Sequence, residues 1–177
     1  DGLMIASLAA RPELRRRNLS ALRLNHSLLR DQIGIRVRFA GKETKKSRPM
    51  DFHFPGWLTG SFEVYVEEVR PVLLRRAQGS DEGWLWIGQH GKPLLPSAIS
   101  ARISATTMRH LGRSVSPHLF RDCAATDIAL FIPEHVGITK SVLGHASLTS
   151  SQASYNQATS FTAVGRLDAV ITGLRED

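Results

Sequence analysis

The sequence predicts an α+β fold that is mainly helical, with a helical body and one small antiparallel sheet. Three observations carry this prediction. Apolar residues recur at helical spacing through most of the chain, strict apolar and polar alternation is confined to 35–54, and helical patterns lie on both sides of that stretch. The chain has 177 residues, of which 42% are hydrophobic, so it is long enough for one domain with a sizeable core.

The N-terminal segment predicts two short helices. An apolar stripe covers residues 3–9, and Pro12 suits the first turn of a second helix that runs through Leu22. Helical spacing places Arg15 on the same inward face as Leu19, while the two arginines that follow it point elsewhere. An arginine on an inward face must either extend its head to solvent or bind an anion.

The middle of the chain predicts a hairpin. Ile35, Val37 and Phe39 alternate with arginines, and a second alternating run follows at 50–54. Between the two runs lies a polar turn at 41–48 that contains three lysines and one arginine. We therefore expect two antiparallel strands with a basic tip.

The remainder of the chain predicts helices. The first covers 58–77 and is kinked or interrupted by Pro71. After a short apolar run at 84–87, Ser97 is a suitable N-cap for a helix that runs through His110. Further helices are expected at 118–130, at 133–143, around Tyr155 and at 161–174, the last of them with an apolar face.

The charge balance points to a polyanionic partner, and nucleic acid is the first candidate. Lys and Arg number 23 against 16 Asp and Glu, which gives a formal net charge of +7. The apolar stretch near the start is far shorter than the roughly 20 residues that span a bilayer, and no signal peptide precedes it. We expect a cytoplasmic protein that is associated with the nucleoid.

The single cysteine and the first residue give two further expectations. Cys123 alone forms neither an internal disulfide nor a CxxC zinc site, and we expect it to be a small buried side chain. The chain begins at Asp1 without an initiator Met and enters an apolar segment at once. We expect it to be one part of a longer protein, with an upstream domain absent.

Two short motifs in the second half of the chain contain groups that could handle phosphate. His118 and Arg121 are one helical turn apart behind Pro117, near a helix N-terminus, where backbone N–H groups favour phosphate. His145 follows Leu-Gly, and Tyr155 comes ten residues later. Taken singly, each is more often a solvated face, a capping histidine or a half-buried aromatic residue.

Taken together and in this order, these features resemble the catalytic domain of the tyrosine recombinases, the phage-integrase family. The resemblance begins with the inward Arg15, continues through the basic hairpin and the HxxR motif, and ends with the LGH motif and the tyrosine. It covers the chain from Leu3 to about Ala158, and its most specific part is 118–155. Residues 1–177 are therefore expected to form a single catalytic domain, without the upstream core-binding domain.

The resemblance implies a DNA strand-cleaving chemistry and a role for each residue. Tyr155 is the nucleophile that attacks the scissile phosphodiester, forms a 3′-phosphotyrosine and releases a 5′-hydroxyl. A phenol has a pKa of about 10 and needs a base and a neutralised phosphate. Arg15 and Arg121 hold the non-bridging oxygens, His118 is the proton acceptor or hydrogen-bond partner, and His145 supports the phosphate.

The family also carries a lysine on the hairpin that protonates the leaving 5′-oxygen. Lys45 fits this position best, Lys42 fits the pattern of another branch of the family, and Lys46 fits least. The chain departs from the family pattern twice. Asn18 stands where many members have Glu, and Tyr155 is one residue further from the LGH motif than in the commonest spacing.

We interpret the sequence as that of a bacterial or phage-encoded DNA site-specific recombinase (integrase) that needs no ATP, metal or other cofactor. Its expected partners are double-stranded DNA and further copies of itself, assembled through the last helix. The alternatives are a strand breaking and rejoining enzyme of the type IB topoisomerase kind, and a catalytically silent DNA-binding relative. A metallohydrolase is set aside because the sequence contains no HExxH spacing.

Overall fold

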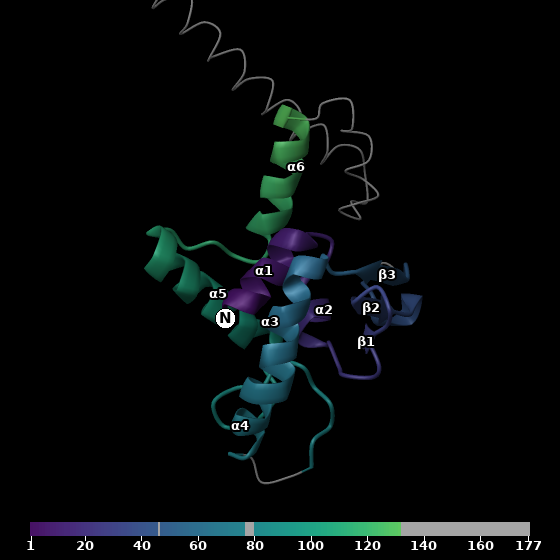
Figure 1. The fold of residues 1–177 in the computed structure, drawn as a ribbon. Helices are drawn as coiled ribbons and strands as arrows, with labels where there is room; N and C mark the ends of the chain where they lie inside the picture. The colour runs from purple at the N-terminus through teal and green to yellow at the C-terminus, as the bar shows by residue number, and fades with distance from the viewer. Residues whose placement is uncertain (46, 77–79, 132–177) are drawn as a thin grey trace, which may run out of the picture. The chain divides into compact units, whose positions relative to one another are not determined.

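The computed structural model describes residues 1–45, 47–76 and 80–131. The chain divides into two compact units, Asp1–His118 and Leu119–Asp177. Figure 1 shows the elements of the first unit, three antiparallel strands and a set of helices. Of the second unit, the described part is α6 (Leu119–Phe131) with its helical backbone. The mainly helical α+β fold that the sequence predicts is confirmed.

Three helices of the first unit pack on one another. They are α1 (Gly2–Ala10), α2 (Arg16–Ser20) and α5 (Pro96–Leu111), and α5 contacts both of the others. These helices carry buried apolar side chains: Met4, Leu8, Leu19, Ile99 and Ile103. Burial of such a residue contributes roughly 1.5–3 kcal/mol. A helix as short as α2, with five residues, is not stable by itself in water, so this packing is what stabilises it.

The second helix starts later than the sequence predicts. A proline disfavours helical backbone at the residue before it, and Arg11 indeed leaves the helical region at φ −137° and ψ 76°, which ends α1. Arg15 is extended, and α2 begins only at Arg16. The connector at 11–15 places the side chain of Leu14 in the core, fully buried. Arg15 is therefore an N-cap residue rather than a residue on a helix face.

The hairpin is confirmed, and a third strand joins it. The sheet order is β1 (Leu28–Arg30), β2 (Ile35–Phe39) and β3 (Met50–His53), antiparallel throughout. The alternating side chains of β2 put Ile35, Val37 and Phe39 into the core. Val37 is opposite Leu28 on one side and Phe52 on the other.

The long helix after the sheet changes its winding in front of Pro71. It consists of a 3₁₀ turn at Gly56–Leu58, α3 (Thr59–Val64), a π-helical turn η3 (Tyr65–Val69) and α4 (Arg70–Leu74). A proline inside a helix lacks one N–H and its ring collides with the carbonyl four residues earlier. The wider π turn relieves this conflict, so the interruption expected at Pro71 is present as a change of pitch.

Aromatic stacking fixes this helix to the rest of the first unit. The ring of Phe62 lies 4.9 Å from that of Phe54 and 6.4 Å from that of Trp86. Further along, the buried guanidinium of Arg70 donates to both carboxylate oxygens of Asp81 and to the carbonyl oxygen of Trp84. The apolar run at 84–87 is thus held against the helix by a ring contact of Trp86 and by the hydrogen bond from Arg70 to Trp84.

The two last described helices begin near their predicted positions. Helix α5 has Pro96 at its first position and Leu95 as N-cap, so Ser97 is not the cap; proline is favoured at the first helical residue. Helix α6 begins one residue after the predicted start at His118. The helices predicted at 133–143, around Tyr155 and at 161–174 lie outside the described residues.

Cys123 is exposed, which corrects the expectation of a buried side chain. Arg121 and Ala125 are buried on α6, and residues four apart share one helix face. Cys123 is midway between them in sequence and therefore points to the opposite face. Within the described residues, no helix is both long enough and apolar enough to cross a membrane.

Candidate functional site

Arg15 is placed at the start of α2 with its backbone fixed. Its carbonyl oxygen accepts the first helical hydrogen bond, from the backbone N–H of Leu19 at 2.8 Å. Its side chain is half-buried, whereas Arg16 and Arg17 are exposed. The predicted contrast between one inward arginine and two outward neighbours is thus present, although the N-cap position of Arg15 and not a helix face produces it.

The connector in front of Arg15 is tied to strand β3 by Arg11, a residue that the sequence gives no reason to single out. Nε and Nη2 of Arg11 donate to the carbonyl oxygen of His53 at 2.8 and 2.5 Å, and Nη1 donates to the carbonyl oxygen of Ala10 at 3.3 Å. The guanidinium carbon lies 5.7 Å from the centre of the Phe52 ring. The segment that ends at Arg15 is therefore anchored on the sheet.

The same strand is tied to the β1–β2 turn through the His53 ring. Nε2 of His53 lies 2.8 Å from Oδ2 of Asp31, whose other oxygen accepts from the backbone N–H groups of Ile33 and Gly34. The hydrogen bond with His53 lowers the pKa of the Asp31 carboxyl, and the two backbone N–H groups act in the same direction. This pair stabilises the end of β3 where Arg11 binds.

The hairpin tip presents both candidate lysines to solvent. Lys42 is in a 3₁₀ turn (Gly41–Glu43), Lys45 follows it, and both side chains are exposed. Oε2 of Glu43 accepts from the backbone N–H of Ala40 at 2.7 Å. The Thr44 hydroxyl lies within hydrogen-bond distance of the carbonyl oxygens of residues 41 and 48, at 3.0 and 2.7 Å. The choice between Lys45 and Lys42 stays a prediction.

The backbone of the tip is tightly folded at Gly41. A side chain at this position would bring its Cβ within 2.7 Å of the carbonyl oxygen of Ser47, a contact that only glycine avoids. Lys46, the least favoured of the three lysines, lies outside the described residues. The tip is therefore a defined turn closed by its own hydrogen bonds, from which the lysine side chains extend.

The outer face of β2 adds positive charge beside the tip. Arg38 is exposed, and Arg36 donates to both oxygens of Asp51 at 2.7 Å each. This hydrogen bonding lowers the pKa of Asp51 and raises that of Arg36. One arginine of the strand is thus paired with a carboxylate across the hairpin, while Arg38 extends its charge toward solvent.

His118 and Arg121 fall in different units of the chain. His118 is exposed at the end of the first unit, directly before α6. Arg121 is in the first turn of α6 and is only 4% exposed. A buried guanidinium is unusual, because removing a charge from water is costly unless hydrogen-bonding partners replace the water. His145 and Tyr155 lie outside the described residues.

The other tyrosine of the chain, Tyr65, has a structural role. The chain contains two tyrosines. The Tyr65 hydroxyl donates to the carbonyl oxygen of Leu85 and accepts from the backbone N–H of Ile87, both at 3.1 Å. Burial raises the pKa of its phenol. Tyr65 is thereby a poor nucleophile, which leaves Tyr155 as the candidate.

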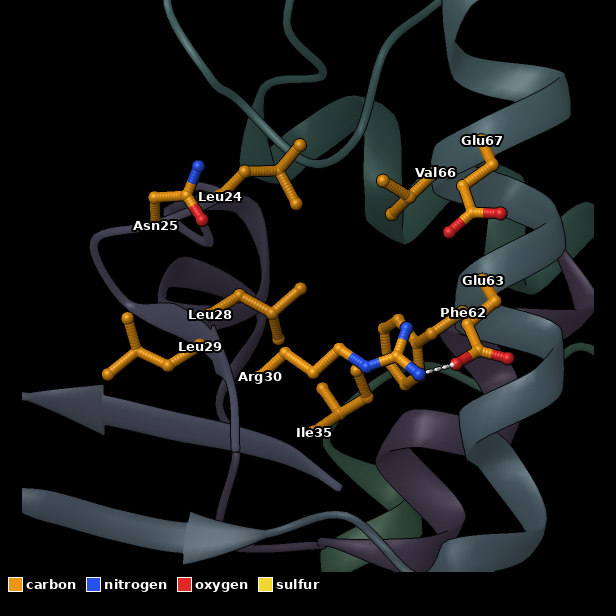
Figure 2. Close-up of a pocket in the computed structure, with 10 residues that line it drawn as sticks. All are labelled: Leu24, Asn25, Leu28, Leu29, Arg30, Ile35, Phe62, Glu63, Val66 and Glu67. Atoms are coloured by element: carbon orange, nitrogen blue, oxygen red, sulfur yellow. Dashed lines mark ion pairs between the residues drawn. The ribbon is translucent and has the colours of Figure 1, made fainter. Parts of the chain in front are cut away.

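A pocket of about 210 Å³ lies between the β1 end of the sheet and the helix of α3 and η3, as Figure 2 shows. It is lined by Leu24, Asn25, Leu28, Leu29, Arg30, Ile35, Phe62, Glu63, Val66 and Glu67. An ion pair of 2.5 Å joins Arg30 to Glu63 within it. Small-molecule sites typically measure about 300–1,000 Å³, so this pocket is small, and the described candidate residues lie elsewhere.

Comparison with known proteins gives sequence relatives of one kind. A tyrosine recombinase XerC of Azotobacter vinelandii is 31% identical over 87 residues, which cover 49% of this chain and 29% of the relative. A tyrosine recombinase XerC of Pseudomonas aeruginosa is 32% identical over 79 residues, which cover 45% of this chain and 26% of the relative. No family model matches the sequence.

Solved structures with a similar fold are of the same kind. The XerH site-specific recombinase, bound to palindromic difH substrate in a post-cleavage complex, aligns with a TM-score of 0.66 and 14% identity over 93% of this chain. The XerA recombinase aligns with a TM-score of 0.63 and 18% identity over 92% of this chain. In sequence over about half of its length, and in fold over most of it, this chain is similar to tyrosine recombinases.

The chain spans 29% and 26% of the two XerC relatives, and 44% and 57% of the XerH and XerA chains. One departure from the family pattern lies in the described part. Asn18, which takes the place of a frequent Glu, is only 4% exposed and sits on α2 three residues after Arg15. A neutral amide there fills the buried position without adding a second charge.

Within the residues that the structure describes, no group of three or more His, Cys, Asp and Glu side chains is arranged to hold a metal ion. The candidate residues of this chain are of a different type. Arg15, His118, Arg121 and the tip lysines supply hydrogen-bond donors and positive charge, which suit an anionic phosphate.

Proposed function

We propose that the chain carries the strand-cleaving and rejoining chemistry of a DNA site-specific recombinase, an integrase-type enzyme. The observation that carries this proposal is the similarity to tyrosine recombinases combined with the ordered set Arg15, Lys45, His118, Arg121, His145 and Tyr155. The net charge of +7 supports a DNA partner, because basic surfaces bind the phosphate backbone. The XerH relative was crystallised with its DNA substrate.

In the proposed reaction, the Tyr155 oxygen attacks the phosphorus of one DNA strand. A new bond forms between that oxygen and phosphorus, and the bond from phosphorus to the 5′-oxygen of the next nucleotide breaks. The phenolic proton passes to an acceptor, for which His118 is the proposed residue, and the lysine of the hairpin tip protonates the departing 5′-oxygen. Rejoining is the reverse reaction, so the phosphodiester energy is retained and no ATP is needed.

The two arginines and the second histidine act on the phosphate. The transition state has five oxygens around phosphorus and more negative charge than the bound substrate. Arg15 and Arg121 are proposed to bind its non-bridging oxygens through their planar guanidinium groups. His145 adds a further hydrogen bond. Such groups act mainly on the rate of cleavage, because the charge they stabilise develops during the reaction.

The test is covalent trapping on DNA. A pool of duplexes of randomised sequence, each with a nick close to the position of cleavage, releases a short oligonucleotide when a strand is cut. The released oligonucleotide, which carries the free 5′-hydroxyl, then diffuses away, so the strand cannot be rejoined and the adduct accumulates. We expect a protein–DNA adduct that survives denaturation, with the DNA attached at Tyr155 in the peptide map.

Four outcomes distinguish the proposed activity from its alternatives. An adduct at Tyr155 through a 3′-phosphate supports the recombinase proposal. DNA binding without any adduct would favour the catalytically silent relative, and attachment at Tyr65 would refute the assignment of the nucleophile. Relaxation of supercoiled DNA without exchange between two sites would favour the topoisomerase-like enzyme.

Self-assembly on DNA is part of the same proposal. The stretch 161–174, which lies outside the described residues, places Phe161, Val164, Leu167 and Ile171 at helical spacing. We assign it to docking either on its own domain or on a neighbouring protomer. Deletion from Phe161 onward should unfold the domain or leave it folded but unable to assemble on DNA. A folded, normally assembling truncation would refute both assignments.

A further inference from the structure

The side chain of Arg11 joins three parts of the first unit. It bonds the carbonyl of Ala10 at the end of α1 and the carbonyl of His53 on β3, and it lies over the ring of Phe52. Both of its bonds to β3 converge on one oxygen, which has two lone pairs to accept them. The residue is half-buried, so these bonds are partly shielded from competing water.

The segment between Arg11 and Arg15 is short and fixed at several points. The backbone N–H of Leu14 donates to the carbonyl of Arg11 at 2.9 Å, and the side chain of Leu14 is fully buried. Arg15 follows directly and is held from its other side by the first turn of α2. The position of Arg15 therefore depends on the anchor at Arg11, the core contact at Leu14 and the start of α2.

We propose that Arg11 is a positioning residue that sets Arg15 in place relative to the β2–β3 hairpin. This inference rests on the proposed function, in which Arg15 binds the scissile phosphate and the lysine of the hairpin tip protonates the leaving oxygen. Strand β3 begins at Met50, just after the tip, and Arg11 binds the strand at its last residue, His53. The side chain of Arg11 therefore connects the segment that carries Arg15 to the strand that carries the tip. Without this connection, the position of Arg15 relative to the hairpin is no longer fixed.

A direct role of Arg11 on DNA fits the contacts less well. All three nitrogens of its guanidinium donate to backbone carbonyls, and the face of the group is covered by an aromatic ring. An arginine that binds phosphate needs donors directed toward solvent, and Arg17, unlike Arg11, is exposed. The chemistry of Arg11 is that of an internal clamp.

The first experiment compares two DNA substrates. One is a nicked duplex that forms the adduct in the trapping experiment, and the other carries a methylphosphonate at the scissile position, which lacks the negative charge. Arg15→Ala should slow the normal substrate about 100- to 1,000-fold and the uncharged one far less. Arg11→Met should also slow the normal substrate more than the uncharged one, with a loss of about 10- to 100-fold on the normal substrate. The reason is that a misplaced Arg15 binds the charged phosphate less well.

The double variant gives the second measurement. If Arg11 acts through Arg15, Arg11→Met combined with Arg15→Ala should cleave no more slowly than Arg15→Ala alone. Arg11→Lys should recover part of the rate, since an ammonium can still donate to the carbonyl of His53. Arg30→Met removes one charge from β1, away from the candidate residues, and should leave both substrates unchanged.

Hydrogen exchange provides a readout that needs no DNA. Arg11→Met should raise the exchange rate of the Leu14 amide at least tenfold, while the amide of Ile103 in α5 keeps its protection. Equal slowing of both substrates, additive losses in the double variant, or unchanged exchange at Leu14 would overturn the inference. If the unchanged chain formed no adduct, the proposed function would fail instead, and exchange at Leu14 would still decide whether Arg11 holds the segment.

Discussion

The Tyr65 hydroxyl donates a hydrogen bond to the carbonyl oxygen of Leu85 across 3.1 Å, which joins the long helix to the apolar run beside it. The ring of Tyr65 also lies 5.3 Å from that of Trp86. One of the chain's two tyrosines is thus a structural residue with its oxygen in use. The two tyrosines should therefore respond in opposite ways to the same substitution.

Tyr155→Phe should abolish the covalent DNA adduct and leave folding and noncovalent DNA binding nearly intact, because only one hydroxyl is lost. Tyr65→Phe is the matched control. It should keep the adduct and lower the free energy of unfolding by about 1 kcal/mol, the usual contribution of one hydrogen bond. Adduct formation and urea unfolding of both variants check this, and an adduct that persists in Tyr155→Phe would disprove the assignment.

The three consecutive arginines at 15–17 should differ in their effects on cleavage and on DNA binding. Arg15→Ala is expected to reduce cleavage about 100- to 1,000-fold with a much smaller loss of binding, because a group that binds developing charge acts on the transition state. The exposed Arg16 should behave differently: Arg16→Ala should weaken binding in a salt-dependent way and leave cleavage of bound DNA unchanged. Single-turnover rates at saturating DNA and binding at two salt concentrations measure both effects. Equal cleavage losses at residues 15, 16 and 17 would contradict the placement of Arg15.

The general acid can be identified with a leaving group that needs no proton. Lys45→Ala should slow cleavage of a normal phosphodiester, and this loss should largely disappear with a 5′-bridging phosphorothiolate, whose sulfur leaves as a thiolate. Lys42→Ala, from the same exposed tip, is the control and should show no such rescue. If the rescue appears in Lys42→Ala and not in Lys45→Ala, the acid is Lys42.

Most of the sheet was predictable because its signal is local. Ile35, Val37 and Phe39 alternate with arginines, and all three are buried as period-two spacing requires. Strand β1 was not predicted, since Leu28–Arg30 is three residues long and shows no alternation. It exists through its pairing with β2, a contact between segments that a local pattern does not contain.

The errors near the site have the same origin. Pro12 suits a helix start by local preference, yet the burial of Leu14 and the anchor of Arg11 on β3 keep 11–15 out of a helix. The contact between Arg11 and His53 joins residues 42 positions apart, so no spacing rule reveals it. The identity of Arg15 as the inward arginine was predictable, whereas the reason for its position was not.

The last prediction concerns the ion pair between Arg70 and Asp81. The hydrogen bond from Arg70 is the largest cause that lowers the pKa of the Asp81 carboxyl below its ordinary value of 3.8. A carboxyl with a lowered folded-state pKa stabilises the fold fully above its unfolded-state pKa, and this contribution is lost as the pH falls through the folded-state value. The Asp81 side chain is 45% exposed, which reduces the contribution through solvent screening, while the Arg70 side chain is only 5% exposed.

Asp81→Asn should therefore lower the free energy of unfolding by about 1–2 kcal/mol at neutral pH, because it leaves a buried guanidinium without its charged partner. The difference between the variant and the unchanged chain should shrink as the pH falls below 3.8 and through the lower folded-state pKa, where the unchanged carboxyl also becomes neutral. Asp51→Asn, which removes the carboxylate of the exposed pair with Arg36, is the matched control and should cost much less at every pH, since both of its partners face water. Urea unfolding of the three proteins at pH 7 and at several values down to pH 3 measures this; a loss in Asp81→Asn that stayed constant over that range would show that the charge of Asp81 does not stabilise the fold.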